Sequence, residues 1–239
     1  MDEEEVLFKV TKSTLESGLR GIPVGYCTTS TVDPLKGLFY AGLAIPQIVD
    51  WQPERVIFLL QQGRDGSAEE VEKFAREIKE NSSVKKELKE AIKKLPRNID
   101  PMKLLATAFL LAGGFESSKD YAKDCLKVIA QAPEITALVI NHHANWQGEV
   151  ESRKELGYME NFAQMLKIPH KTQPEFASIL KKFNILHYDH GGGNLSTFVG
   201  KCVASGLEDM YGSLASALLA LAGPRHGRAN QECLEFTKK

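Results

Sequence analysis

Hydrophobic residues recur every three or four positions along most of the chain, the spacing that places them on one face of an amphipathic helix. A capping box at 67–70 marks one helix start, and Pro101 is placed to open another. Such helices are predicted to stop at Pro96, at Gly113-Gly114 and before Pro133. Further helices are predicted around 121–129, after Pro174, and over 194–206, 211–222 and 228–239. The pattern therefore indicates a mainly α protein.

Two stretches break the helical pattern. Residues 18–45 are predicted to form short extended segments joined by turns. Within them, Val24-Gly25-Tyr26 and Leu38-Phe39-Tyr40 favour strands, and Asp33-Pro34 favours a turn. Residues 135–140 are apolar on every face, which fits either a buried strand or a buried helix. Small residues dominate the helices predicted at 194–206 and 211–222, so these two helices are expected to lie deep in the bundle.

Composition narrows the class of protein without naming a function. The 239 residues carry 30 basic and 31 acidic side chains, a net charge of −1, which offers no general attraction for nucleic acid or an anionic membrane. No apolar run is long enough to span a bilayer. The four cysteines are far apart and form no C-x-x-C pair, so reduced thiols are expected. The acidic start at Met1–Glu5 is unlike a secretory signal or a mitochondrial presequence, which predicts a cytoplasmic protein.

The densest polar cluster surrounds a run of glycines at 191–193. His187, Asp189 and His190 precede the glycines, and Asn194 follows them. Glycines let backbone amides approach a ligand closely. Three interpretations stay open: a hydrogen-bonded turn between helices, a zinc site using the three residues before the glycines, or a pocket for a small anion.

A second cluster places His226 among glycines and arginines, just before the helix predicted at 228–239. The positive end of a helix disfavours an imidazolium ion and so favours a neutral ring. A neutral imidazole can donate a hydrogen bond to a substrate carbonyl and stabilise the enolate that forms. A surface histidine in a turn is the alternative. The pair His142-His143 is interpreted as polar residues at a helix end.

The motifs together resemble the signatures of citrate synthases. The first signature is the block at 187–196, and the second is the block at 221–232, Leu-Ala-Gly-Pro-Arg-His-Gly-Arg-Ala-Asn-Gln-Glu. Residues 18–37 resemble the amino-terminal segment of the family, and residues 98–102 resemble its mid-chain helix start. The resemblance covers nearly the whole chain.

Membership of that family implies an almost all-helical fold with a large and a small domain, working as a dimer. The implied reaction condenses acetyl-CoA with oxaloacetate to citrate and CoA, in the tricarboxylic acid cycle, with no metal or cofactor. By position, His226 matches the catalytic histidine that hydrogen-bonds the thioester carbonyl, and His190 matches a histidine that binds oxaloacetate. His187, Asn194 and Ser196 match substrate-pocket residues that shape the oxaloacetate site and orient the catalytic histidine.

The chain also departs from the family pattern. It contains no counterpart of the second catalytic histidine, of the aspartate that removes the methyl proton, or of the arginines that clamp oxaloacetate. Residues 1–239 are therefore expected to be the amino-terminal half or so of the enzyme, a multi-helical large domain incomplete at its C-terminus, with the small domain truncated or absent. The family usually has arginine where this chain has Ala41.

On its own the chain is expected to be inactive. Its expected partner is a second copy or a complementing C-terminal half. The alternatives are a 2-methylcitrate synthase or a non-catalytic interaction module with the same fold.

Overall fold

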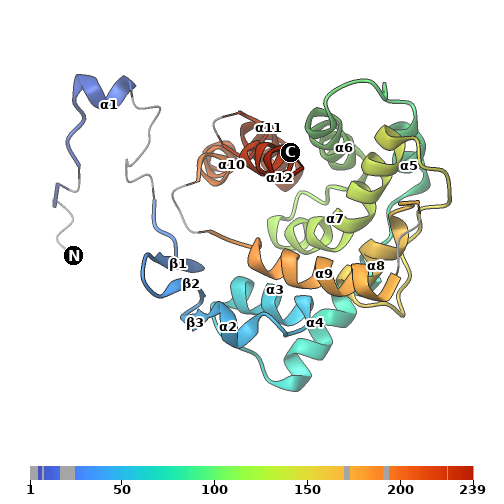
Figure 1. Ribbon diagram of the computed structural model, residues 1–239, viewed down its shortest axis with the longest axis horizontal. Helices are drawn as coiled ribbons and strands as arrows, with labels where there is room; N and C mark the ends of the chain where they lie inside the picture. The colour runs from blue at the N-terminus through green and yellow to red at the C-terminus, as the bar shows by residue number, and fades with distance from the viewer. Residues whose placement is uncertain are drawn as a thin grey trace.

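The computed structural model describes residues 5–6, 8–16, 25–169, 173–190, 194–224 and 226–238. Its helices are α1 (Lys12–Glu16), α2 (Ile45–Ile48), α3 (Pro53–Gln62), α4 (Ala68–Glu80), α5 (Lys86–Lys93), α6 (Pro101–Glu116), α7 (Tyr121–Ala144), α8 (Tyr158–Met165), α9 (Gln173–Leu186), α10 (Leu195–Ser205), α11 (Met210–Leu221) and α12 (Ala229–Thr237). The strands are β1 (Ser30–Asp33), β2 (Gly37–Tyr40) and β3 (Leu43–Ala44). The mainly α class is confirmed (Figure 1).

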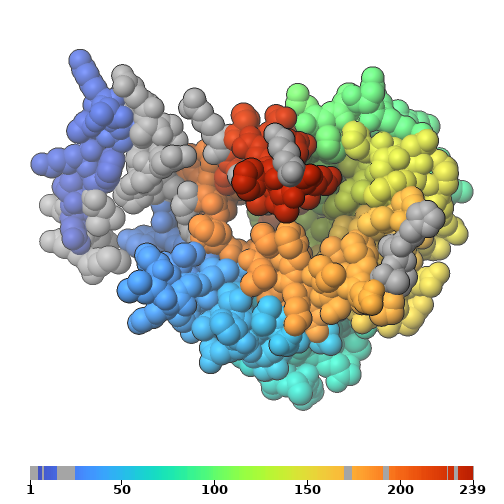
Figure 2. Space-filling view, in the orientation of Figure 1, coloured from blue at the N-terminus to red at the C-terminus, as the bar shows by residue number. Residues whose placement is uncertain are grey.

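The strands form one small antiparallel sheet in the order β1-β2-β3, with Ser30 opposite Tyr40. The β1–β2 turn is held by Asp33, whose carboxylate accepts the backbone N–H groups of Leu35 and Lys36, both at 2.8 Å. The expected turn at Asp33-Pro34 and strand at 38–40 are confirmed. The expected strand at 24–26 is not: Gly25 and Tyr26 are irregular, and Val24 lies outside the described residues. Helix α1 lies at one side of the molecule (Figure 2).

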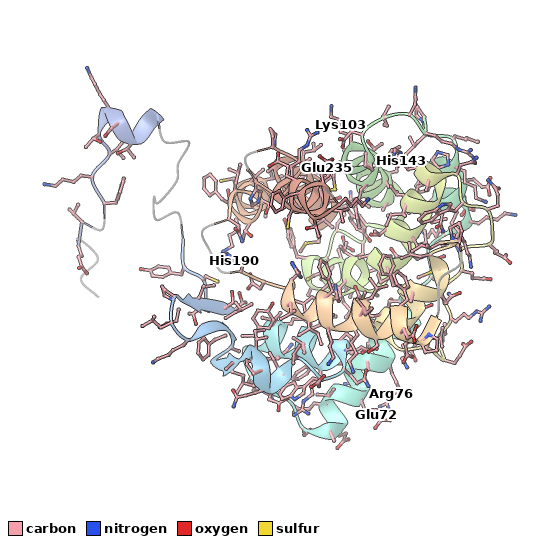
Figure 3. The ribbon with its side chains drawn as sticks, in the orientation of Figure 1. Glu72, Arg76, Lys103, His143, His190 and Glu235 are labelled. Atoms are coloured by element: carbon pink, nitrogen blue, oxygen red, sulfur yellow. The ribbon has the colours of Figure 1, made fainter. Side chains whose placement is uncertain are left out.

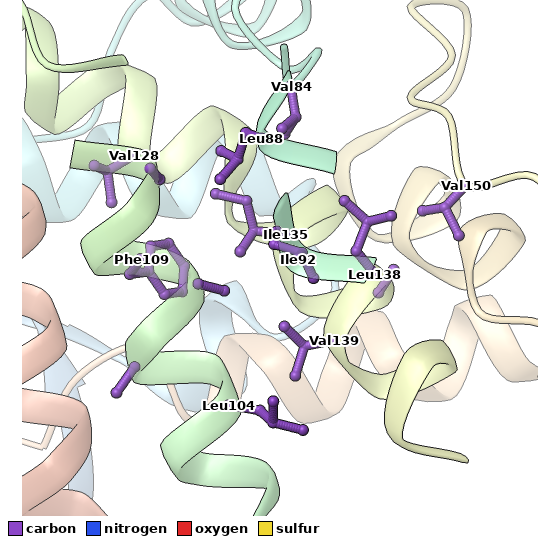
Figure 4. Packing of buried hydrophobic residues seen from close by; sticks show 14 of the residues in the cluster. Val84, Leu88, Ile92, Leu104, Phe109, Val128, Ile135, Leu138, Val139 and Val150 are labelled. Atoms are coloured by element: carbon purple, nitrogen blue, oxygen red, sulfur yellow. The ribbon is translucent and has the colours of Figure 1, made fainter. Parts of the chain in front are cut away.

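The main core lies between α5, α6, α7 and α11. Its largest members include Leu88, Ile92, Leu104 and Ile135 (Figure 4), together with Tyr211. Each of these side chains is at most 1% exposed. Burying such side chains stabilises the fold by about 1.5–3 kcal/mol each. The core therefore holds α6 and α11 together, and α11 leads directly into the turn that carries the second polar cluster.

A second core cluster joins the N-terminal sheet to the helical body. Tyr40, Ile48, Leu59 and Ile185 are fully buried in it, and they come from β2, α2, α3 and α9. The cluster fixes the end of α9, where the first polar cluster begins, against the strands of the sheet.

Two predicted helix ends are wrong. Helix α7 continues through Pro133, so residues 135–140 are a buried helix. Proline cannot donate to the carbonyl of Ile129 four residues earlier. That carbonyl instead accepts a hydrogen bond from the hydroxyl of Tyr158, at 2.7 Å. A side chain from α8 thus replaces the missing helical donor, and α7 runs on over the core.

Helix α6 likewise continues through Gly113 and Gly114 to Glu116. A Cβ on Gly113 would lie 3.0 Å from Cβ of Tyr211, whereas a Cβ on Gly114 would meet nothing within 4 Å. Gly113 is therefore a contact point between α6 and α11, not a helix stop.

The expected depth of the two small-residue helices is half right. Helix α11 buries Tyr211, Gly212, Ser213 and Ala215, but α10 has no fully buried residue. The helices predicted after 67–70, Pro101 and Pro174 are present as α4, α6 and α9. His142 and His143 do lie in the last turn of α7, as interpreted.

Candidate active site

Ser196 and His226 meet at the point where α10 begins and α11 has ended. Ser196 is the second residue of α10, and His226 lies in the turn between α11 and α12. Nε2 of His226 is 2.9 Å from Oγ of Ser196. The backbone N–H of Ser196 also points at Nε2, with an N–N distance of 3.3 Å. The two polar clusters of the sequence are therefore joined by a direct contact.

This contact fixes the tautomer of the neutral ring. A backbone amide can only donate a hydrogen bond, so Nε2 of His226 must accept it. The proton of a neutral imidazole is then on Nδ1, on the opposite side of the ring. We assign His226 as an Nδ1–H donor from this geometry. Such a ring can offer its N–H to a carbonyl or an oxyanion.

The turn that carries His226 is tightly closed. The N–H of His226 bonds the carbonyl of Gly223 at 3.0 Å, and the N–H of Gly227 bonds the carbonyl of Leu221 at 2.9 Å. A Cβ on Gly227 would lie 2.5 Å from that Leu221 oxygen, so glycine is required for this turn. Helix α12 begins at Ala229, which places His226 just before a helix start, as predicted.

Close packing of α10 on α11 brings Ser196 to this turn. A Cβ on Gly200 would lie 3.3 Å from Cβ of Ala217, so small residues set the distance between the two helices. Asn194 is the N-cap residue of α10, but its side chain makes no capping hydrogen bond. The carbonyl of Asn194 accepts the N–H of Phe198 at 2.9 Å, the first hydrogen bond of the helix. The amide side chain of Asn194 is therefore not used to start the helix.

His187 is held separately, at the end of α9. Its Nδ1 lies 2.7 Å from the carbonyl oxygen of Phe183, and the two rings stack with centroids 4.1 Å apart. The carbonyl accepts, so Nδ1 of His187 carries a proton. Both contacts orient the His187 ring against Phe183, one helical turn earlier in α9. Among the described residues, no hydrogen bond or ring contact joins His187 to Ser196 or His226.

His190 is exposed and lies beyond the end of α9 (Figure 3). Its backbone N–H bonds Oδ1 of Asp189 at 2.7 Å. The three glycines at 191–193 and Arg225 lie outside the described residues. The structure thus brings Ser196 and His226 together, and places His187 and His190 on the segment that leads to them.

The sequence did not indicate that Thr29 and Tyr40 lie beside Asp189 and His190. The Thr29 hydroxyl donates to Oδ2 of Asp189, and the N–H of Asp189 bonds the Tyr40 hydroxyl oxygen at 3.2 Å. Tyr40 in turn donates to the carbonyl of Ile185 at 2.8 Å. Burial raises the pKa of Tyr40, which keeps this hydroxyl protonated. Thr29 and Asp189 are 160 positions apart, so no periodicity or spacing could have paired them.

Cys27 lies near the same cluster. Burial raises the pKa of its thiol, but hydrogen bonds with Thr29 and Ser30 outweigh that effect and leave the pKa below its ordinary value. All four cysteines are free thiols, as expected.

Two surface grooves lie away from the candidate residues. These two open grooves share Gln52, Gly157 and Glu160, beside α3 and α8. None of the candidate residues lines either groove. The candidate site is defined here by side-chain contacts among the described residues.

Comparison with known proteins identifies the family of the chain. A family model described as citrate synthase, C-terminal domain, matches residues 18–239. The chain is 31% identical over 256 residues to citrate synthase 4, mitochondrial, of Arabidopsis thaliana, an alignment covering 97% of this chain and 53% of the relative. It is 30% identical over 258 residues to the 2-methylcitrate synthase, mitochondrial, of Aspergillus fumigatus, covering 98% of this chain and 56% of that enzyme.

Solved structures agree with these relatives. The crystal structure of citrate synthase from Pyrobaculum aerophilum has a TM-score of 0.78 and 27% identity, over 90% of this chain and 57% of that one. Citrate synthase of Thermoplasma acidophilum, in a ternary complex with carboxymethyl coenzyme A and oxaloacetate, has a TM-score of 0.79 and 26% identity, over 89% and 57%. The chain spans about half the length of the relatives it matches.

The expected cytoplasmic location is contradicted by these comparisons. The relatives are named as mitochondrial enzymes, in plants and in a fungus. The acidic opening of the sequence was a poor guide, because the composition of a few residues carries little information about compartment. In the part of the chain that the structure describes, no helix is both long and apolar enough to cross a membrane.

The match over residues 18–239, the relatives at about 30% identity and the shared helical fold together show that this chain belongs to the citrate synthase family.

Proposed function

We propose that residues 1–239 supply part of the active site of a citrate synthase, an acyltransferase that condenses acetyl-CoA with oxaloacetate in the tricarboxylic acid cycle. The observation that carries the proposal is the contact of Ser196 with His226, which leaves an Nδ1–H donor for the substrate. The bound carboxymethyl coenzyme A and oxaloacetate of the Thermoplasma acidophilum relative support this substrate class. No metal or cofactor is required.

In this proposal His226 is the catalytic residue of the chain. Its Nδ1–H bonds the thioester carbonyl oxygen of acetyl-CoA while a carboxylate base removes a methyl proton. The electron pair of the broken C–H bond forms an enolate, whose oxygen His226 stabilises. One well-placed donor of this kind contributes about 10²–10³ in rate. Ser196 is the positioning residue that holds the ring in the required tautomer.

The enolate carbon then forms a bond with the carbonyl carbon of oxaloacetate, and that carbonyl oxygen takes up a proton. Water finally cleaves the thioester, releasing citrate and CoA. We place oxaloacetate near His190, with His187 and Asn194 shaping the pocket. Both histidine rings lie on the segment between α9 and α10, and the Asn194 amide makes no capping bond.

The remaining chemistry needs residues that 1–239 does not contain. The base that removes the methyl proton has no counterpart here, and its loss lowers a rate by about 10²–10⁴. The arginines that clamp a dianion are missing as well, and such a ligand needs bidentate cationic partners. We therefore treat residues 1–239 as an incomplete large domain that is inactive alone.

The test is release of the CoA thiol from acetyl-CoA and oxaloacetate. The chain is assayed alone and after addition of the part of the Arabidopsis thaliana relative that the match leaves uncovered, supplied as a separate chain. We expect no release from the chain alone and CoA release in the mixture. Robust CoA release from the chain alone would overturn the proposal that the active site is divided between residues 1–239 and a second piece. No CoA release in either assay, although the two chains are shown to associate, would favour a non-catalytic interaction module.

A 2-methylcitrate synthase is the second candidate, because the Aspergillus fumigatus relative carries that name at 30% identity. The same assay with propionyl-CoA in place of acetyl-CoA separates the two reactions. A higher kcat/KM with propionyl-CoA would assign the chain to the 2-methylcitrate reaction.

We also propose that the chain associates with a second copy. Neighbouring helices α6 and α11 expose Leu110 and Leu219, each by half or more of its surface. Apolar side chains exposed on packed helices favour association. Light scattering of the purified chain tests this: a mass twice that of one chain is expected, and a monomer at all concentrations would contradict it.

A further inference from the structure

The segment between α9 and α10 is tied to the N-terminal sheet through Asp189, the residue before His190. Oδ2 of Asp189 accepts the hydroxyl of Thr29, and Oδ1 accepts the backbone N–H of His190 at 2.7 Å. The backbone N–H of Asp189 bonds the Tyr40 hydroxyl oxygen at 3.2 Å. One carboxylate oxygen and the backbone N–H of Asp189 thus bond to Thr29 and Tyr40 at the sheet. The other carboxylate oxygen bonds to the backbone of His190.

The sheet end of this connection is rigid. The carbonyl of Thr29 accepts the N–H of Ala41 at 2.8 Å, which extends the ladder between β1 and β2. Tyr40 is fully buried and spans from β2 to the carbonyl of Ile185, at 2.8 Å. A hydroxyl presented from such a framework has little freedom to move. Thr29 therefore fixes the position of the Asp189 carboxylate, and this carboxylate fixes the backbone of His190.

We infer that Thr29 and Asp189 are positioning residues that hold His190 in place for its anionic substrate. The inference rests on the proposed function, in which His190 binds oxaloacetate. Asp189 does not itself bind the substrate, because a carboxylate beside a dianion repels it and both oxygens of Asp189 already accept hydrogen bonds. The N-terminal sheet thereby acquires a part in substrate binding, although its residues lie far from His190 in sequence.

The decisive variant is Thr29→Val, which removes the hydroxyl and keeps the shape of the side chain. Thr29→Ser keeps the donor, and Thr31→Val, two residues further on in β1, removes an exposed hydroxyl as a matched control. Amide hydrogen exchange of the 239-residue chain is followed by NMR. We expect Thr29→Val to speed exchange of the Asp189 and His190 amides by about tenfold, as for a lost hydrogen bond to a charged group. Buried amides of α7 should keep their rates, and the other two variants should match wild type.

The functional measurement is the KM for each substrate in the mixture that releases CoA. For Thr29→Val we expect the KM for oxaloacetate to rise about tenfold, with the KM for acetyl-CoA unchanged and with recovery in Thr29→Ser. Unchanged exchange at Asp189 and His190 would overturn the inference. Faster exchange with an unchanged KM for oxaloacetate would also overturn it, because the tie would then be structural only. An inactive wild-type mixture would refute the proposed function, while the exchange rates of the chain alone would still decide whether Thr29 holds His190.

Discussion

The backbone amide of Ser196 determines which ring nitrogen of His226 can donate a hydrogen bond. The sequence named both residues, through the likeness of their motifs to a family. It could not reveal the tautomer, because that depends on a contact between residues 30 positions apart. An N–H pointed at Nε2 leaves Nδ1 as the donor. The tautomer of His226 therefore depends on the position of the first turn of α10, which carries the Ser196 amide.

The tautomer of His226 is directly measurable. We expect its neutral ring to carry the proton on Nδ1 in nitrogen-15 NMR of the chain above pH 7. His142 provides an internal reference of the opposite kind, because its Nε2 faces the carbonyl of Leu95 at 2.8 Å and must be the protonated nitrogen. Protonation of His226 on Nε2 would contradict the assignment and remove the proposed donor.

At the scale of elements, the main errors of prediction come from long-range partners. Proline predicts a helix end in the absence of a substitute donor, and Tyr158 supplies one to Ile129 from another helix. Paired glycines likewise suggest a stop, but Gly113 is where Tyr211 packs. Helix α8 carries that tyrosine and was not predicted at all. Local signals such as the capping box at 67–70 were read correctly because their partners lie within one turn.

Removing the Tyr158 hydroxyl should weaken α7. Tyr158→Phe keeps the ring but leaves the Ile129 carbonyl without its donor, because Pro133 cannot replace it. An unsatisfied buried carbonyl costs about 1–3 kcal/mol. We expect urea unfolding to show a loss of this size. Tyr26→Phe is the matched control, since Tyr26 is 73% exposed, and it should leave stability unchanged. Equal stability of the Tyr158 variant would show that the carbonyl finds another partner.

The two glycines of α6 should respond in opposite ways to alanine. Gly114→Ala meets nothing within 4 Å and should stabilise the helix by about 0.5–1 kcal/mol. Gly113→Ala would place its methyl 3.0 Å from Cβ of Tyr211 and should destabilise the protein by about 1–3 kcal/mol. Thermal unfolding of the two variants provides the comparison. A stabilising Gly113→Ala would mean that α6 and α11 can separate without loss.

Hydrogen bonds from the α6–α7 loop to Asp124 should make the free energy of unfolding depend on pH. Burial raises the pKa of Asp124, but hydrogen bonds from Ser118 and Ser117 outweigh it and hold the pKa below its usual value. A carboxyl group with a lowered folded pKa stabilises the protein above its unfolded pKa of about 3.9 and loses that contribution as pH falls. Asp124→Asn should therefore reduce unfolding free energy at pH 7 by about 1–3 kcal/mol. The difference from wild type, measured by urea unfolding, should shrink below pH 4; a constant difference would contradict this.

At the scale of the whole molecule, the chain holds together two polar clusters that its sequence presented separately. The α class and the two clusters could be predicted, because helical periodicity and short motifs are local. The tie from Thr29 to Asp189 could not, because it depends on the sheet, α3 and the end of α9 packing into one core. The roles of His190, His187 and Asn194 stay predictions, to be tested through substrate binding.

The central claim is that His226 is the catalytic donor of a citrate synthase site, and CoA release by the reconstituted mixture tests it most directly. His226→Gln is compared with wild type, with His143→Gln as a control in which an exposed histidine at the end of α7 is replaced. We predict that His226→Gln lowers kcat at least about 10²-fold, as for loss of an oxyanion donor, while His143→Gln keeps wild-type activity. Undiminished CoA release by His226→Gln would contradict the account.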